Sequence, residues 1–264
     1  GTVIDEIEIL IVAGGGGSRC TTAANIYSGG AGAGGIVYDA DYAVVSGVAY
    51  DLTVGAGGSA ETSWTGGQQS NGADSVWNVN AEGSGIAMTA KGGGYDGVYN
   101  EDGVAGGSGG GGSTPENASA GASNQADFSG ATSYGNAGGA SGGGGGAGEA
   151  GGTAGTGKGG TGVLFSGFVA FGTDSDNNAS DGSDGGYFGS GGTRGATGTN
   201  GAGGGGGGSA GASAVAGLAN TGGGAGGQFT GGGQPTRPGA VGGSGVILIR
   251  YAGGTAAAGG TITA

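Results

Sequence analysis

The segment EIEILIVAGGGG, residues 6–17, passes directly from a hydrophobic run into four consecutive glycines. Residues 3–12 predict a β-strand whose first half carries three acidic residues and whose second half is apolar on both faces. This pattern indicates a strand that enters a buried sheet from solvent. The same junction is reversed in GGSGVILIRY, residues 242–251. Two apolar strands therefore bracket a chain that is mostly glycine between them.

Glycine occupies 83 of the 264 positions and proline only three, whereas glycine usage is ordinarily about 7%. Collagen is excluded, because it requires glycine at every third position and abundant proline. A flexible linker is one interpretation of such a composition. In an ordered structure, backbone hydrogen bonds and close backbone packing must instead offset the large entropy that glycine loses.

The glycine blocks, of which the longest are Gly142–Gly146 and Gly203–Gly208, are predicted to be structural elements. Polyglycine can form an extended three-fold helix of the polyproline II type, and unlike proline it keeps its N–H groups for sideways hydrogen bonds. At about 3.1 Å per residue, six glycines span about 19 Å, the length of an ordinary strand. Short polar and aromatic insertions would then be the turns between packed rods.

Helical periodicity is nearly absent. Further strands are predicted at GGIVYDA (34–40), VAYDLTVGAGG (48–58), DSVWNVN (74–80), GIAMTAKGGG (85–94) and GVLFSGFVAFG (162–172). The expected fold class is all-β, with a short-strand β-sandwich or sheet module combined with packed polyglycine II-type rods and loops, and essentially no helix. We expect one compact unit, in which residues 1–91 and 245–251 form the β-rich module, 92–244 the glycine rods, and 252–264 a tail that is a possible donor strand.

The formal net charge is −13, and the six cations are scattered singly. Without a basic stripe we expect no nucleic-acid partner. No apolar run approaches the length of a transmembrane helix, so we expect no membrane insertion. The chain has no histidine, which excludes Ser-His-Asp and Cys-His catalysis. GTAGTGKG (152–159) lacks the Ser or Thr that a phosphate loop needs after its lysine, and the carboxylates are dispersed. We therefore expect no enzymatic activity.

One segment, TDSDNNASDGSDGG (173–186), begins as a calcium loop does, with D-x-D-x-N. Ala179 stands where the turn glycine belongs, and the distal glutamate is missing, so a solvated acidic turn is the other interpretation. Calcium is the one cofactor considered. The candidate ligands are Asp174, Asp176, Asn178, Asp181 and Asp184.

Two N-glycosylation sequons begin at Asn117 and Asn178. The single Cys20 forms no internal disulfide, and is either a buried thiol or a partner for another chain. Aromatic residues punctuate the glycine-rich region, where they either fill gaps at rod ends or form a receptor- or glycan-binding surface on loops. The candidate receptor-binding residues are Trp64, Tyr95, Tyr99, Tyr134, Tyr187 and Phe188, and Phe229 belongs to the same set of aromatic residues.

The order of motifs resembles the glycine-rich domain of phage tail-fibre adhesins and related bacterial surface proteins. The matching pieces, which reach to Tyr251, are EILIVAGGGG, GAGAGGIVY, YDLTVGAGG, NGADSVW, IAMTAKGGG, the glycine blocks and GGSGVILIRY. The resemblance implies β-strands with packed polyglycine rods in an extracellular or virion-surface protein, and implies no catalytic activity. The segment AGGTAAAGGTITA, which follows Tyr251, departs from the pattern.

Two functions remain open from the sequence. The first is a structural subunit that self-assembles into an extracellular filament, a homopolymer held by strand addition between neighbouring subunits. Its donor strand would come from residues 1–12 or from the small, nearly uncharged segment 255–264, and the alternative is that either tail folds back on its own subunit. The candidate subunit contacts are Val3, Ile7, Ile9, Ile11, Thr261, Ile262 and Thr263. The second function is a tail-fibre tip adhesin whose aromatic loops bind a host surface glycan or protein.

Overall fold

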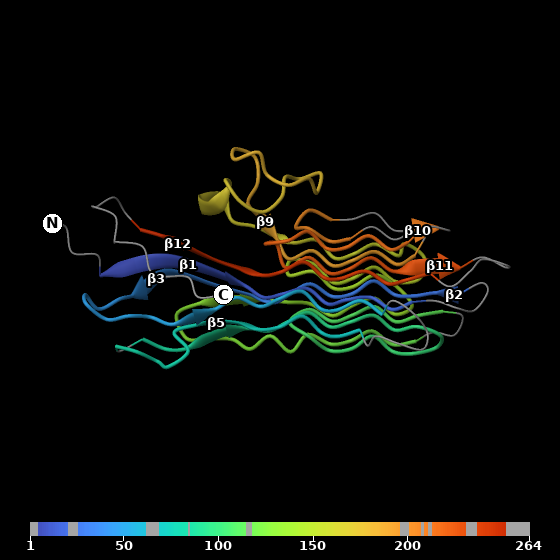
Figure 1. Cartoon of the computed structure of the whole chain (residues 1–264), viewed down its shortest axis with the longest axis horizontal. Coiled ribbons are helices and arrows are strands. Elements are labelled where there is room, and N and C mark those ends of the chain that lie inside the picture. Colours follow the sequence, from blue (N-terminus) through green and yellow to red (C-terminus); the bar gives the residue numbers. More distant parts are fainter. Residues whose placement is uncertain are drawn as a thin grey trace.

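The structure, a computed structural model, describes residues 5–20, 26–61, 69–83, 85–114, 118–195, 201–206, 209–210, 213–230 and 237–251. This part of the chain is an elongated body with short strands at both ends and extended backbone running lengthwise between them (Figure 1). The described residues contain no α-helix and one turn of 3-10 helix, η1 (Ser166–Phe168). The all-β fold with essentially no helix is therefore confirmed.

The main sheet is built around β1 (Glu6–Val12), which pairs on one side with β12 (Val246–Arg250) and on the other with β3 (Ile36–Ala43). Beyond β3 the sheet ends with β7 (Thr132–Tyr134), and every pairing is antiparallel. The two apolar strands that bracket the chain are thus direct neighbours.

Strand β1 contributes to two cores, because successive side chains alternate across a sheet. On one face Ile9 packs in a cluster that includes Met88, and on the other Leu10 packs in a cluster that includes Phe188. All four side chains are fully buried. This two-sided burial explains why the second half of the strand is an unbroken apolar run.

Smaller sheets surround the main one. A three-stranded antiparallel sheet and a hairpin lie near the main sheet, whereas a third small sheet lies at the opposite end of the body (Figure 1). Their strands are β4 (Leu52–Thr53), β5 (Ser75–Trp77) and β6 (Met88–Ala90), then β8 (Val163–Leu164) and β9 (Tyr187–Phe188), and finally β2 (Ile26–Tyr27), β10 (Ser209–Ala210) and β11 (Gln228–Thr230).

Between the sheets, the glycine-rich segments form rods with a period of three residues. The six N–H groups of residues 13–18 donate in rotation to segments 32–35, 70–73 and 240–243, at N–O distances of 2.9–3.1 Å. Residues three apart in the donor rod therefore donate hydrogen bonds to the same neighbouring rod. This is the periodicity of a polyproline II-type helix, so the predicted polyglycine II rods are present.

Each central rod is surrounded by others on all sides. The carbonyls of residues 13–18 accept bonds from three further rods, through the N–H groups of Gly58, Gly93 and Ala225, so this rod has six neighbours. The rod at 28–35 donates to two antiparallel neighbours and to a parallel one, 142–145. Backbone hydrogen bonds thus extend in every direction across the layer, rather than within a plane as in a sheet.

The packing distance between rods excludes side chains. A Cβ atom added to Gly15 would lie 2.1 Å from the carbonyl oxygen of Gly223, and one added to Gly93 would lie 2.2 Å from that of Gly32. Real Cβ atoms essentially never approach a backbone oxygen below 3.0 Å. The glycine content is therefore a steric requirement of the layer.

Two differences from the sequence-based expectation have a physical cause. Rods are not confined to 92–244, since 13–18 and 28–35 lie at the centre of the layer and strands continue directly into rods. The predicted strand at 162–172 is strand only at Val163–Leu164, because Phe165 and Phe168 both turn into the core on one face of the main sheet. The segment around 165–186 then projects beyond the body (Figure 1).

Candidate functional site

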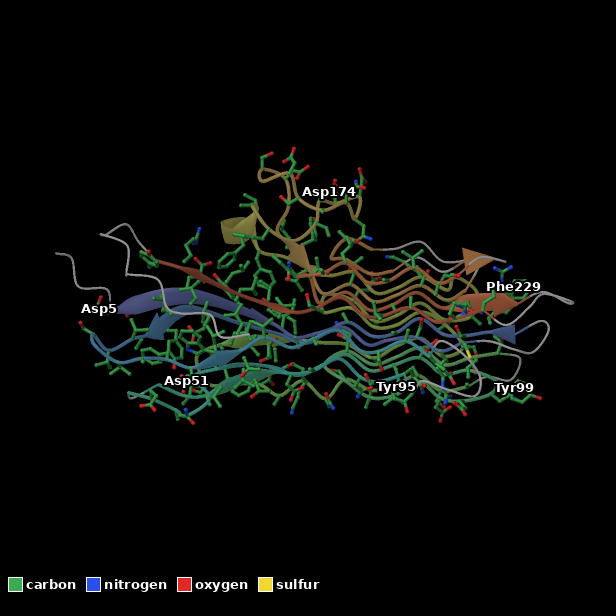
Figure 2. All side chains as sticks on the ribbon, viewed as in Figure 1. Asp5, Asp51, Tyr95, Tyr99, Asp174 and Phe229 are labelled. Atoms are coloured by element: carbon green, nitrogen blue, oxygen red, sulfur yellow. The ribbon has the colours of Figure 1, made fainter. Side chains whose placement is uncertain are left out.

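Tyr99 occupies a strained turn at the end of the body far from the main sheet (Figure 2). Its side chain is 58% exposed. Tyr99 and Asn100 both have positive φ, at 49° and 62°, and the N–H of Glu101 donates to the carbonyl of Val98 at 3.3 Å. A left-handed conformation is unfavourable for a bulky L-residue, and such outliers concentrate at functional sites. The turn therefore presents an aromatic ring to solvent at a conformational cost.

Arg19 and Asp96 anchor this turn to the rods. The backbone N–H of Arg19 donates to Oδ1 of Asp96 at 3.0 Å, and its guanidinium forms ion pairs with Glu101 and, at 3.6 Å, with Glu61. Asp96 is fully buried and its Oδ2 has no partner among the described residues. Burial raises the pKa of Asp96 well above the ordinary value of 3.8.

Cys20 lies beside this anchor and is fully buried. Burial, followed by the charge of Glu61, raises the pKa of its thiol to about 11. The thiol therefore stays protonated near neutral pH and is a poor nucleophile. Of the two roles considered for Cys20, the structure places it as a buried thiol.

Further aromatic residues at the same end form a stack. The rings of Tyr27 and Phe229 are stacked with centroids 4.2 Å apart, and the guanidinium carbon of Arg194 lies 4.4 Å from the Tyr27 centroid. Arg194 is buried and donates from Nη1 to the carbonyl of Ser141 at 3.0 Å. The stack closes the end of the rod layer.

The remaining candidate receptor residues do not share one surface. All three remaining tyrosines are half-buried: Tyr134 lies on β7, Tyr187 on β9, and Tyr95 on a glycine-rich segment outside the strands. Phe188 is fully buried in the core, so its assignment to a binding surface is wrong: β9 turns alternate side chains inward and outward. Trp64 lies outside the described residues.

Tyr134 lines a groove beside the main sheet. The groove consists of two cavities of about 550 and 260 Å³, which share Tyr134 and Leu164 as a common wall. In the smaller cavity, Glu8 accepts a bond from the Tyr38 hydroxyl at 2.7 Å and pairs with Nε of Arg250. Burial and the neighbouring Glu8 raise the pKa of Tyr38 to about 12.

The structure does not assemble the candidate calcium ligands into one site. The carboxylate of Asp174 accepts backbone bonds from Asp176 and Asn178 at 2.9 and 2.8 Å, and a third from the Asn178 amide. These bonds lower the pKa of Asp174. Asp181 makes a separate turn with Ser183, and Asp184 is exposed. Within the described ranges, no group of three or more His, Cys, Asp or Glu residues is placed to hold a metal ion.

Two further predictions concern glycosylation and subunit contacts. Asn178 is exposed, whereas Asn117 lies outside the described residues. Ile7, Ile9 and Ile11 are buried in the core of their own chain, and β1 has a partner strand on both sides. It presents no open edge to a neighbour in this structure. The other candidate contacts, Val3, Thr261, Ile262 and Thr263, lie outside the described residues.

Sequence reasoning missed the charged residues that stabilise the Tyr99 turn and the groove beside the main sheet. Arg19 meets Asp96 and Glu101 across 77 and 82 positions, and Glu8 meets Arg250 across 242. No local spacing marks such pairs. The one available signal is that cations are rare in this chain, so each is a candidate for a specific partner.

Comparison with known proteins agrees with this architecture. The family model for the glycine-rich domain matches residues 2–252, which includes the main sheet and every described rod. No curated protein matches the chain. In the described part of the chain, no helix has the length and apolar character needed to cross a bilayer. The chain belongs to the glycine-rich domain family.

Proposed function

We propose that this chain is a non-enzymatic recognition protein, an adhesin that presents the Tyr99 turn to a target on another surface. The observation that carries the proposal is the exposed Tyr99 ring at positive φ, on a turn anchored by Arg19. Aromatic side chains held rigidly supply large contact area at little entropic cost, which suits them to binding hot spots.

The distance between the Tyr99 turn and the main sheet supports this function. Glu8 pairs with Arg250 in the main sheet, and Asp5, next to β1, lies at the end of the body opposite Tyr99 (Figure 2). Hydrogen-bonded rods lie between the main sheet and the Tyr99 turn and would act as a stiff spacer.

The resemblance to phage tail-fibre adhesins supports the same proposal in more detail. In it, the protein acts at a virion surface or another extracellular site, and its partner is a host surface glycan or protein. No cofactor takes part, and the described residues offer recognition surfaces in place of a reactive group.

The test is binding of the fluorescently labelled chain to a panel of bacterial cells, measured by flow cytometry. Tyr99→Ala is expected to lose at least tenfold in binding with its melting temperature retained. The matched control is Leu52→Ala, which removes a similarly exposed side chain, 46% exposed, next to Asp51 at the opposite end (Figure 2). Absence of binding to every cell type, or equal binding by Tyr99→Ala, would refute the proposal.

A second candidate function is self-assembly into an extracellular filament, and the specific observation in its favour is an open sheet edge. Strand β12 ends the main sheet, and no strand of the described residues pairs with its outer edge. Ile249 on this strand is 43% exposed. An added strand from a neighbouring copy would complete the sheet and produce a homopolymer.

Negative-stain imaging and light scattering distinguish the two functions. A filament subunit forms regular fibres, and Ile249→Pro, which removes a backbone donor from β12, is expected to abolish them. Discrete particles at all concentrations would exclude the filament and leave the adhesin proposal intact.

A further inference from the structure

The groove beside β7 is independent of the Tyr99 turn and has its own chemistry. Its two cavities meet at Tyr134, which forms an edge-to-face contact with Phe165 at a centroid distance of 5.7 Å. The buried Phe165 ring thereby fixes the orientation of Tyr134. On the other side of the junction, Leu164 is 49% exposed. An extended ligand would therefore cross a preformed aromatic ring.

The smaller cavity combines this ring with polar groups of fixed orientation. Glu8 is held by the Tyr38 hydroxyl and by Nε of Arg250, which leaves both Nη groups of Arg250 as donors. The guanidinium lies against the backbone at Gly167, where an added Cβ would come within 2.8 Å of it. The cavity volume, about 260 Å³, is below the range of about 300–1,000 Å³ typical of drug-sized ligands, and suits a single ring.

The larger cavity combines glycines with small polar and apolar residues. Glycines contribute to its wall at 135, 148 and 162, and Asn136 contributes an amide whose Nδ2 donates to the carbonyls of Gly146 and Ala147. Glycine walls allow a ligand to approach backbone polar groups closely. The N–H groups of Gly148 and Gly162 already donate to Thr161 and Ala202, so this wall would meet ligand hydroxyls through carbonyl oxygens, each of which has two lone pairs.

We infer that this groove binds a neutral oligosaccharide, with one pyranose ring against Tyr134 and its hydroxyls at Arg250, Glu8 and the glycine-lined wall. A pyranose has an apolar C–H face and a rim of hydroxyls, which matches an aromatic ring bordered by donors and acceptors. Tyr134, a receptor-binding candidate from the sequence, is the central residue of this site.

The charge of the groove selects against anionic sugars. Among the residues that the structure describes, Glu8 and Arg250 are the only charged ones that line the two cavities, and they neutralise each other. The net charge of the whole chain, −13, repels polyanions within a Debye length. An extended peptide is disfavoured as well, because β7 is three residues long and offers few ladder bonds.

The experiment is an array of neutral, carboxylated and sulfated oligosaccharides of two to six units, probed with the labelled full chain. A library of extended hexapeptides is probed in parallel. The expected result is retention on neutral oligosaccharides alone, with affinity rising from two to three units as both cavities are filled. Retention of only acidic sugars or peptides, or of nothing, overturns the inference.

Variants locate the site. Tyr134→Ala is expected to weaken binding at least tenfold, and Tyr134→Phe to retain most of it. Leu164→Trp narrows the groove at an exposed position and is expected to weaken binding with the fold unchanged, which covers the case that Tyr134→Ala is unstable. Tyr99→Ala should leave oligosaccharide binding unchanged. A failure of the oligosaccharide inference can therefore be distinguished from a failure of the adhesin proposal, which depends on Tyr99. If Tyr134→Ala and Leu164→Trp both fold and bind the oligosaccharide as tightly as the unchanged chain, the assignment of the binding site to this groove is refuted.

Discussion

The backbone N–H of Arg19 donates to the buried carboxylate of Asp96 at 3.0 Å, and this contact ties the end of the central rod to the turn that carries Tyr99. A fully buried carboxyl group is expensive to ionise. The position of the turn is therefore coupled to the protonation of one side chain.

Asp96 is expected to make stability depend on pH. The pKa of Asp96 in the folded state is raised above the ordinary value of 3.8, which applies to the unfolded chain. The folded state therefore holds this proton more tightly than the unfolded state. Its contribution to the free energy of unfolding is fully present below pH 3.8 and is lost as the pH rises through the folded pKa. Asp96→Asn keeps the shape without the charge and should flatten the decline. Urea unfolding across this window measures the effect, with the exposed Asp127→Asn as control. An unchanged pH slope in Asp96→Asn would contradict the assignment.

Gly15→Ala is expected to disrupt the rod layer. The added Cβ would lie 2.1 Å from the carbonyl oxygen of Gly223, which is backbone and cannot move aside alone. We expect a loss of at least about 4 kcal/mol in the free energy of unfolding, the range of the most severe single substitutions. The matched control is Gly155→Ala, where an added Cβ meets nothing within 4 Å. That variant should be neutral or gain up to about 1 kcal/mol, and similar losses in both would refute the steric argument.

Tyr99→Gly is expected to stabilise the chain although it removes a large side chain. A left-handed residue costs about 1–2 kcal/mol relative to glycine, and the extra freedom of glycine in the unfolded state returns about 0.4–1 kcal/mol of this. The difference gives a net gain in unfolding free energy of about 0–1.6 kcal/mol, centred near 0.8 kcal/mol. Thermal melts compare it with Tyr95→Gly, whose φ is not positive. Destabilisation in Tyr99→Gly would show that the ring contributes to folding.

The thiol of Cys20 is expected to be unreactive in the native protein. Its pKa of about 11 keeps the thiolate scarce at pH 8, and its burial blocks access. A chromogenic disulfide reagent at pH 8 should therefore titrate no thiol until urea unfolds the chain, and then one. Rapid reaction before unfolding would show that the Arg19 end opens locally.

Much of the architecture could be predicted because its causes are local. The unbroken apolar half of β1 predicts a strand buried on both faces, and clusters that include Met88 and Phe188 cover those faces. The glycine blocks predict side-chain-free rods, since polyglycine has one extended conformation that keeps its N–H groups for neighbours. Hydrogen bonds repeating every three residues confirm this prediction.

Where strands end was harder to predict. At 48–58 and 85–94 the sequence suggests continuous strands, but pairing covers only Leu52–Thr53 and Met88–Ala90 before rods begin. An extended backbone is compatible both with a β-strand and with a polyproline II-type rod. The number of neighbours around it, which is a tertiary property, decides between them.

The candidate sites show the same division. Composition and motif order determine a non-basic, histidine-free, glycine-rich chain with aromatic residues on its loops. Which aromatic residues remain at the surface depends on chain packing: Phe188 fills the core, Tyr134 lines a groove, and Tyr99 is held in solvent. Their partners, such as Phe165 for Tyr134, come from distant segments. Local sequence encodes conformation and steric fit, whereas burial and pairing follow from contacts that form only when the whole layer assembles.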